Sequence, residues 1–248
     1  MRYEGHNLRD PLFDQLARLA GRFAQPVCFP DPGKNAFRNG SGFLVCLGGR
    51  TFGVTCHHVI AEYRETRGPA PVPTLEFGRA RIDPEEHLVA ESPDLDVVTL
   101  DLTRLVGQPN GIDPASCIVP REWPPEELDA EDVLALAGFP GIGREQVESD
   151  YFRFHLFSAG TTAVASRGGP THFYTRIDLE DSIVGGVRPD VSDDLGGLSG
   201  GPVFVWRKTP ILVAELVGII KEYQADLDLM YVRRASCLRS VGTLRVEA

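Results

Sequence analysis

The sequence predicts an all-β protein made of many short strands. The chain of 248 residues contains 26 glycines and 19 prolines, which favour frequent turns. Short apolar runs recur between these turns, without the long helical segments that a βαβ sheet would require. The pattern favours a β-sandwich or a pair of β-barrels, and the length suffices for one large domain or two small ones.

The elements are expected in the following order. A helix is predicted over residues 10 to 24, with Asp10 as N-cap and Pro11 at its first position. Residues 25 to 40 are rich in Pro, Gly and Asn, which is typical of a connecting loop. Strands are predicted at 42–47, 51–56, 74–82, 87–91 and 97–102, and again at 132–137, 152–158, 173–179, 202–206, 211–220 and 229–232. The polar, proline-rich stretch 108–131 between the two sets is the best candidate for an interdomain linker.

Composition excludes several classes of function. The net charge of -10 disfavours a nucleic-acid-binding surface. Five cysteines without CxxC spacing argue against a disulfide framework and against a zinc site, and no metal or organic cofactor is expected. The N-terminus has no apolar leader and no stretch is long enough to cross a membrane, so a cytoplasmic protein is expected.

The segment GGLSGGP at 196–202 is the most informative in the chain, because it leads into an apolar strand. A serine hydroxyl is a poor nucleophile unless a base takes its proton and the developing oxyanion is bound. Flanking glycines allow the backbone to turn tightly, so that the N–H groups of Gly197 and Ser199 can form an oxyanion hole. A glycine-rich turn without catalytic role is the alternative. A phosphate-binding loop is excluded because no GK[ST] follows.

Two further segments supply a base and an acid. The hairpin opened by GSGF at 40–43 ends in the run VTCHHVI at 54–60, which offers His57 and His58. The run PDLDVVTLDL at 93–102 offers Asp94 and Asp96 at the start of an apolar strand. A carboxylate there can orient an imidazole and stabilise its charged form, although either aspartate could simply cap the strand.

The order His, Asp, Ser on a β-rich chain is the order found in chymotrypsin-type enzymes. Together the segments resemble the trypsin-like peptidase family, in particular its bacterial HtrA-like branch. The resemblance rests on GSGF, on T-x-x-H-V around His58, on D-[VIL]-x-x-L at the aspartate and on G-x-S-G-G-P at the serine. The turn AGFPG at 137–141 and the run VGII at 217–220 also resemble that family, so that residues 38 to 238 are covered.

This resemblance implies two six-stranded antiparallel β-barrels with a catalytic site between them. The expected boundaries are an N-terminal extension with its helix at 1–37 and a peptidase domain at 38–248. Within that domain, barrel one would span about 38–107 and barrel two about 132–248. His58 would be the general base, Asp96 the orienting acid with Asp94 as the alternative, and Ser199 the nucleophile. His57 stands where the family usually has alanine.

Two departures from the family pattern concern activation and specificity. Leu198 stands where digestive members carry an aspartate that pairs with a newly cut N-terminus, so that switch cannot operate here. Asp193 lies where members that prefer basic residues carry a pocket carboxylate, although the acidic loop around it could instead be solvated. Ile220 and Lys221, after the cleft strand, complete the expected substrate pocket.

The leading hypothesis is a serine endopeptidase that performs limited proteolysis of an intracellular partner, without nucleic acid or membrane as ligand. An activating or substrate partner protein is compatible with it. The alternative is an inactive pseudopeptidase that serves as a protein-binding module, but such proteins usually lose one of the three catalytic residues. An esterase is disfavoured because G-x-S-x-G elbows belong to α/β chains.

Overall fold

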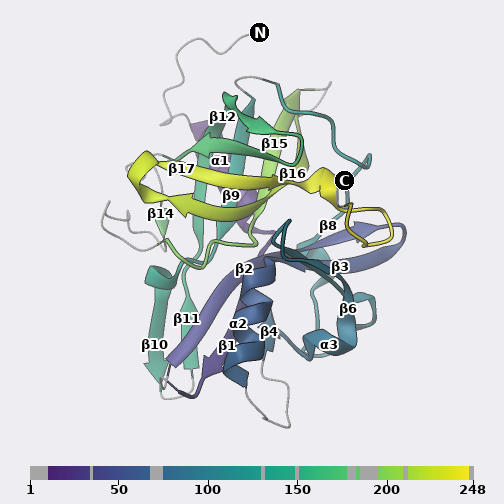
Figure 1. Ribbon diagram of the computed structural model, residues 1–248, viewed down its shortest axis with the longest axis vertical. Helices are drawn as coiled ribbons and strands as arrows, with labels where there is room; N and C mark the ends of the chain where they lie inside the picture. The colour runs from purple at the N-terminus through teal and green to yellow at the C-terminus, as the bar shows by residue number, and fades with distance from the viewer. Residues whose placement is uncertain are drawn as a thin grey trace.

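Two β-sheet bodies make up the molecule and lie one above the other in Figure 1. The computed structural model describes residues 11–33, 36–67, 75–129, 132–148, 151–177, 183–184, 195–208 and 212–245. Each strand predicted from the sequence overlaps an observed one, and the all-β, chymotrypsin-like class is confirmed. The predicted strand at 74–82 is in fact two strands, because Gly78 turns the chain at φ +62°.

The first sheet contains the histidine and aspartate segments. Its strands follow the order β5-β4-β1-β2-β3-β7-β6, and β8 pairs with β2. Within the described residues this sheet stays open, with β5 and β6 at its edges, so the first predicted barrel is a half-barrel. The three-residue strands β4 and β5 offer few ladder hydrogen bonds with which a ring could close. The bounds are β1 Ala24–Asp31, β2 Ala36–Leu47, β3 Arg50–Thr55, β4 Leu75–Phe77, β5 Ala80–Ile82, β6 Leu88–Ser92, β7 Val97–Asp101 and β8 Cys117–Ile118.

The second sheet carries the serine segment and closes into a barrel. Its strands follow the order β13-β17-β16-β15-β9-β12, and pairing of β12 with β13 completes the ring. The short β14 pairs with β12 outside this ring, and β10 and β11 form a separate hairpin. The bounds are β9 Val133–Gly138, β10 Arg144–Glu148, β11 Tyr151–Phe154, β12 Phe157–Gly169, β13 His172–Arg176, β14 Ile183–Val184, β15 Pro202–Lys208, β16 Leu212–Gln224 and β17 Leu229–Arg234.

Helices are few and short. The helix α1 (Pro11–Gly21) packs against β9, β12 and β15 of the second barrel, and the predicted cap Asp10 lies outside the described residues. The helix α2 (His57–Arg67) follows β3, and α3 (Pro84–His87) precedes β6. Single 3₁₀ turns lie at Thr103–Leu105, Pro114–Ser116, Gly141–Gly143, Ala225–Leu227 and Ala235–Cys237. No helix in the described ranges combines the length and apolar character needed to cross a membrane.

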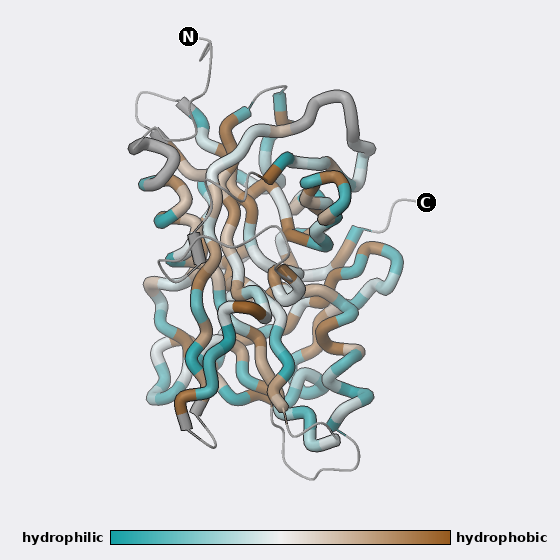
Figure 2. Tube along the Cα trace, turned by 90° about the vertical axis from the view of Figure 1, so that its left-hand side faces the viewer, coloured by the Kyte–Doolittle hydropathy of each residue, from teal (hydrophilic) through white to brown (hydrophobic). Residues whose placement is uncertain are grey.

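Three apolar clusters hold the molecule together, one in each sheet and one shared between them. The shared cluster includes Phe43 and Val54 of the first sheet with Ala137 and Ile219 of the second. Hydrophobic residues accordingly follow the inner strand segments in Figure 2, whereas hydrophilic residues follow the outer turns. Burial of apolar surface stabilises such contacts by about 25 cal/mol per Å². The shared cluster therefore fixes the two bodies against each other, and with them the segments that carry the site.

The prediction of a loop over residues 25 to 40 is wrong, because β1 and the start of β2 occupy most of this segment. Pro26 and Pro30 suggested a break in regular structure. However, β1 pairs with β4 only at Val27 and Cys28, so Pro30 lies on a part of the strand with one described neighbour, where proline is tolerated. The first sheet therefore begins at Ala24, inside the segment expected to be an N-terminal extension.

Candidate active site

His58 stands in the first turn of α2, where the strand β3 passes into the helix. Val59, Ile60 and Tyr63 are buried and anchor the helix to the first sheet, whereas the side chain of His58 is 52% exposed. The sequence suggested a short helical turn here, and the structure has a helix of 11 residues. The neighbouring His57 places Nε2 3.9 Å from Glu91 Oε2. The backbone of His58 is therefore held by the packed helix, while its imidazole is accessible to a reactant.

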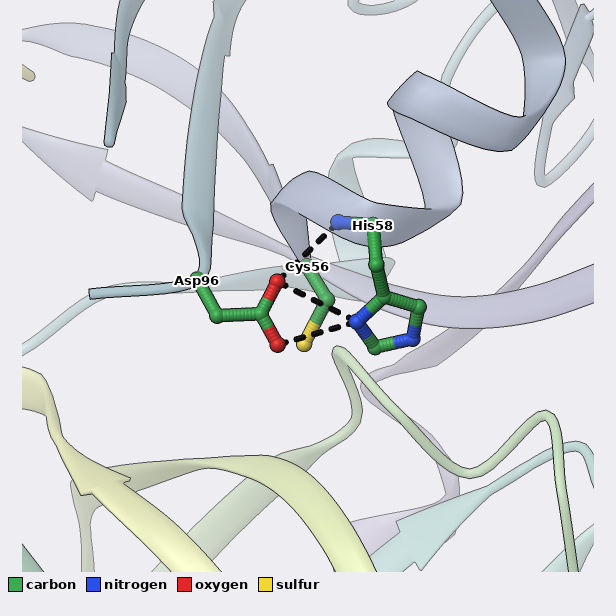
Figure 3. A group of neighbouring side chains, drawn as sticks. All are labelled: Cys56, His58 and Asp96. Atoms are coloured by element: carbon green, nitrogen blue, oxygen red, sulfur yellow. Dashed lines mark hydrogen bonds and ion pairs between the residues drawn. The ribbon is translucent and has the colours of Figure 1, made fainter. Parts of the chain in front are cut away.

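Asp96 binds both the ring and the backbone of His58. The ring Nδ1 lies 2.9 Å from Asp96 Oδ2 and 3.1 Å from Oδ1, and the His58 backbone N–H donates to Oδ1 at 3.0 Å. The carboxylate thus also accepts from an N–H group of the first helical turn, which lacks an intrahelical partner. Figure 3 shows the second ring nitrogen turned away from Asp96. This arrangement favours the Nδ1–H tautomer and leaves Nε2 unbound by the carboxylate.

The environment keeps Asp96 ionised. Burial by itself would raise the pKa of this carboxyl, but hydrogen bonds from the ring and backbone of His58, with the positive charge of Lys221, hold the pKa below its usual value. Asp96 also adopts a left-handed conformation at φ +56°, which costs about 1 kcal/mol for a non-glycine residue. Asp94 is exposed and does not hydrogen-bond to His58 in the described structure. The geometry selects Asp96 of the two candidates.

Ser199 lies in the glycine-rich loop directly before β15. Gly200 adopts φ +93°, and a Cβ added there would lie 2.0 Å from the carbonyl oxygen of Ser41. Only glycine therefore permits this approach of the loop to β2. Leu198, before the serine, is buried in the core of the second barrel. The loop is therefore held by packing at the residue directly before the serine.

The serine segment and the histidine segment meet at one carbonyl group. Ile220 O accepts hydrogen bonds from Gly200 N at 2.7 Å and from Cys56 Sγ at 3.3 Å. Gly200 follows Ser199, and Cys56 stands two residues before His58. The Ser199 hydroxyl itself donates to Lys221 O at 2.8 Å, and no hydrogen bond joins it to His58 within the described residues. The segments of Ser199 and His58 therefore converge on Ile220 O, with the Ser199 hydroxyl in a resting orientation on Lys221 O.

The predicted oxyanion-hole donors remain unused in the described structure. Gly141 N donates to Gly196 O at 2.6 Å, and Ser41 Oγ donates to Gly197 O at 2.7 Å. In a trans peptide the C=O and the following N–H point in opposite directions, so the first of these bonds also fixes the direction of Gly197 N–H. No acceptor is bound by Gly197 N–H or Ser199 N–H within the described residues. Both groups can thus donate to a developing negative charge.

Ser41 was given no role by sequence reasoning, yet it connects three parts of the site. It is fully buried, its N–H donates to Ser199 O at 2.9 Å, and its hydroxyl binds Gly197 O and accepts from Phe139 N at 2.8 Å. Asn39 adds a bond to Phe139 O at 2.7 Å. The GSGF motif contained the signal, since a serine between two glycines at the start of a hairpin needs a specific partner.

Replacing Ser41 by alanine is expected to lower kcat of the hydrolysis proposed below by about 10-fold, with KM little changed. The change leaves Gly197 O and Phe139 N without their hydrogen-bond partner, so the oxyanion donors are less well oriented. The expected loss in kcat is therefore smaller than the loss that follows removal of such a donor. Steady-state kinetics with a chromogenic ester would measure both constants. Thr99→Ala is the matched control, because Thr99 is also buried and bonds a carbonyl, that of Gly242, outside the site. Equal losses of kcat in both variants would contradict this role.

The predicted substrate-pocket residues have different fates. Ile220 is a correction: its side chain is fully buried and packs in the core of the second barrel, so it does not face a substrate pocket. Lys221 is half-buried, with its ammonium 4.8 Å from the centre of the Tyr231 ring. Asp193 lies outside the described residues.

Cys56, His58 and Asp96 present ligand atoms within 4.8 Å of one another, the kind of grouping that can hold a metal ion (Figure 3). The thiol is buried and donates to Ile220 O, and its pKa is raised well above the usual value, mainly by burial. Asp96 and the His58 ring already use each other as partners. The protonated thiol is thus a poor metal ligand. The three residues are better described as a His–Asp pair packed against a cysteine than as a metal site.

The structure therefore defines a chymotrypsin-fold protein that places a His–Asp pair beside a glycine-flanked serine. No protein-family model and no curated protein matches the sequence. Among solved structures, the chain is similar to a protease from M. tuberculosis in its active form, with 15% identity and a TM-score of 0.46 over 91% of this chain and 82% of that one.

Two further similar structures are a protease and an inactivated paralogue. The protease Anisep from Arthrobacter nicotinovorans shares 15% identity with a TM-score of 0.46, over 86% of this chain and 90% of that one. An inactivated protease paralogue of the scabies mite shares 13% identity with a TM-score of 0.47, over 87% of this chain and 90% of that one. Proteases and an inactivated protease paralogue thus stand among the similar structures.

Proposed function

We propose that this protein is a serine endopeptidase, with Ser199 as nucleophile, His58 as general base and Asp96 as orienting acid. The observation that carries the proposal is the pairing of the His58 ring with Asp96 next to the serine loop, both segments being bonded to Ile220 O. Three groups with separate roles at one site are what acyl transfer requires. No cofactor takes part in this proposal.

The reaction follows from the roles of these groups. Ser199 Oγ leaves Lys221 O and attacks the scissile carbonyl carbon, while His58 Nε2 accepts the hydroxyl proton. Gly197 N–H and Ser199 N–H donate to the oxyanion. His58 then protonates the leaving amine, and a water activated by the same nitrogen hydrolyses the acyl-enzyme. Asp96 stays ionised and stabilises the imidazolium, in line with its lowered pKa.

The substrate belongs to the proposal as well. We infer that the substrate is a protein partner that undergoes limited cleavage. We place this partner inside the cell because all five cysteines carry free thiols, as suits a reducing compartment. A partner could also serve as activator by drawing the Ser199 hydroxyl from its resting orientation. A preference for basic residues through Asp193 is the simplest hypothesis for specificity.

A second candidate function is an inactive protein-binding module on the same fold. The observation that favours it is the bond of Ser199 Oγ to Lys221 O, in place of a hydrogen bond to His58 within the described residues. Catalytic hydrogen bonds are often long or incomplete in unliganded enzymes, so this orientation is compatible with either function. The two functions differ in whether the serine reacts.

Labelling with a fluorophosphonate probe tests the proposal. The folded protein is expected to react covalently, heat-denatured protein is expected not to react, and mass spectrometry of the labelled peptide is expected to place the adduct on Ser199. Reaction requires an activated serine but no knowledge of the natural substrate. Folded protein that stays unlabelled, also in the presence of a peptide library, would support the binding module instead.

A further inference from the structure

Arg233 is a buried cation that the proposed mechanism does not use. It lies near the end of β17 in the second barrel, its exposed fraction is 5%, and it is the one basic residue among the buried residues of the described structure. Its guanidinium donates to three backbone carbonyls: Nε to Leu95 O at 2.9 Å, Nη2 to Asp94 O at 3.3 Å and Nη1 to Thr171 O at 3.3 Å. Two of these carbonyls belong to the residues directly before Asp96.

The partners of this guanidinium set it apart from an ordinary ion pair. No carboxylate lies within ion-pair distance of Arg233 in the described residues, so backbone carbonyls compensate for the loss of water, together with the face of the Tyr231 ring, whose centre lies 5.8 Å from the guanidinium carbon. Burying a charge is costly unless its hydrogen bonds are made. The planar fork of arginine offers several donors in fixed directions, and a lysine cannot reproduce that geometry. The interaction therefore depends on arginine at this position and on the location of the backbone turn that contains Asp94 and Leu95.

Arg233 binds the backbone turn that leads to Asp96, and the conformation of this turn requires support. Asp96 has a left-handed backbone, and the other hydrogen bonds made by the backbone N–H groups of this turn are local: Asp96 N donates to Pro93 O at 3.1 Å and Leu95 N to Ser92 Oγ at 3.2 Å. Among the described residues, Arg233 supplies the hydrogen bonds that reach this turn from the second barrel. The acid of the first sheet is thereby tied to the barrel that carries Ser199.

We propose that Arg233 is a positioning residue for the catalytic acid, acting from the opposite barrel on the backbone that carries Asp96. The proposal rests on the proposed function in so far as Asp96 is the acid. Arg233 touches neither substrate nor reacting atoms, and its effect passes through the 94–96 backbone to the His58–Asp96 pair.

The test compares Arg233→Met and Arg233→Lys with Arg234→Met. Arg234 is the matched control, because it is the next residue on the same strand and bonds a backbone carbonyl, Gly169 O at 3.1 Å, outside the turn. Two properties are measured in each folded variant: the far-downfield proton resonance of His58 Nδ1–H, and the rate of labelling by a fluorophosphonate. The resonance reports the His58–Asp96 hydrogen bond directly, which a loss of overall stability in a still-folded protein would not change.

In Arg233→Met the resonance is expected to disappear or move upfield, and the labelling rate to fall by about 10- to 100-fold, because small misplacements of catalytic groups are costly. Arg233→Lys is expected to be intermediate, and Arg234→Met to match the wild type. If Arg233→Met does not fold, the lysine variant decides. An unchanged resonance and rate in a folded Arg233 variant would overturn the proposal. If the wild type is never labelled but the resonance still depends on Arg233, the positioning role stands and the peptidase function falls.

Discussion

The Ser199→Ala variant is expected to hydrolyse a chromogenic ester or peptide about a million-fold more slowly than the wild type in kcat, the scale on which catalytic serines act. The reason is that alanine removes the only atom that can form the acyl-enzyme, while the His58–Asp96 pair and the oxyanion donors remain. KM is expected to change little, since the hydroxyl makes its decisive bond only as the reaction proceeds. Steady-state kinetics with active-site titration would measure both constants.

The control for this variant is Ser116→Ala. Ser116 is a half-buried serine in a 3₁₀ turn whose hydroxyl bonds the carbonyl of Asp113, so its loss is expected to leave kcat unchanged. The melting temperature of Ser199→Ala should stay close to that of the wild type, because the residue only loses its hydrogen bond to Lys221 O. Hydrolysis by Ser199→Ala at a tenth of the wild-type rate or more would exclude Ser199 as nucleophile.

Asp96→Asn is expected to lower kcat on the order of 10⁴-fold at neutral pH. The amide would retain the shape of the site, but an asparagine can donate to Nδ1 and thereby favour the tautomer in which Nε2 carries the proton. The base would then be blocked and the imidazolium would lose its counter-charge. Stopped-flow or steady-state measurement over pH 5 to 9 would give the size of the loss. Asp94→Asn is the control, because the Asp94 side chain is exposed and its backbone carbonyl is retained.

The same substitution has a signature in stability. Because the pKa of Asp96 is lowered in the folded protein, its ionised form contributes stability that is complete above the unfolded-state pKa of about 4 and is lost as the pH falls through the folded-state value. The free energy of unfolding of Asp96→Asn is therefore expected to lie below that of the wild type at pH 6, and the gap to narrow toward pH 2. Urea titrations at several pH values would show this. A gap that widens in acid would contradict the assignment.

The sequence allowed the three catalytic candidates to be found because each stands in a short local motif. Ser199 lies between glycines, His58 follows a strand, and Asp96 precedes one, so adjacent residues alone carry the signal. The choice between Asp96 and Asp94 needed the structure, because both start an equally plausible strand and only the turn decides which carboxylate reaches the helix α2.

Other features could not be predicted because they arise from contacts between distant residues. Ser41 acts on Gly197 and Phe139, and Arg233 acts on Leu95, each pair separated by about a hundred residues or more in the sequence. The burial of Ile220 in the core of the second barrel is not revealed by the apolar run 217–220. The sequence did not predict the strand β1, because its prolines indicated a loop more strongly than the alternating apolar residues Val27 and Phe29 indicated a strand.

The double acceptor at Ile220 O has a mechanical consequence. One carbonyl serves as the common acceptor for the loop of the proposed nucleophile and for the strand end before the proposed base, since Gly200 and Cys56 both bond to it. Any hinge motion that separated the two β bodies would have to break one of these bonds before His58 and Ser199 moved apart. Because Gly200 and Ile220 both belong to the second barrel, the bond from Cys56 is the one of the two that opposes separation of the β bodies at this point.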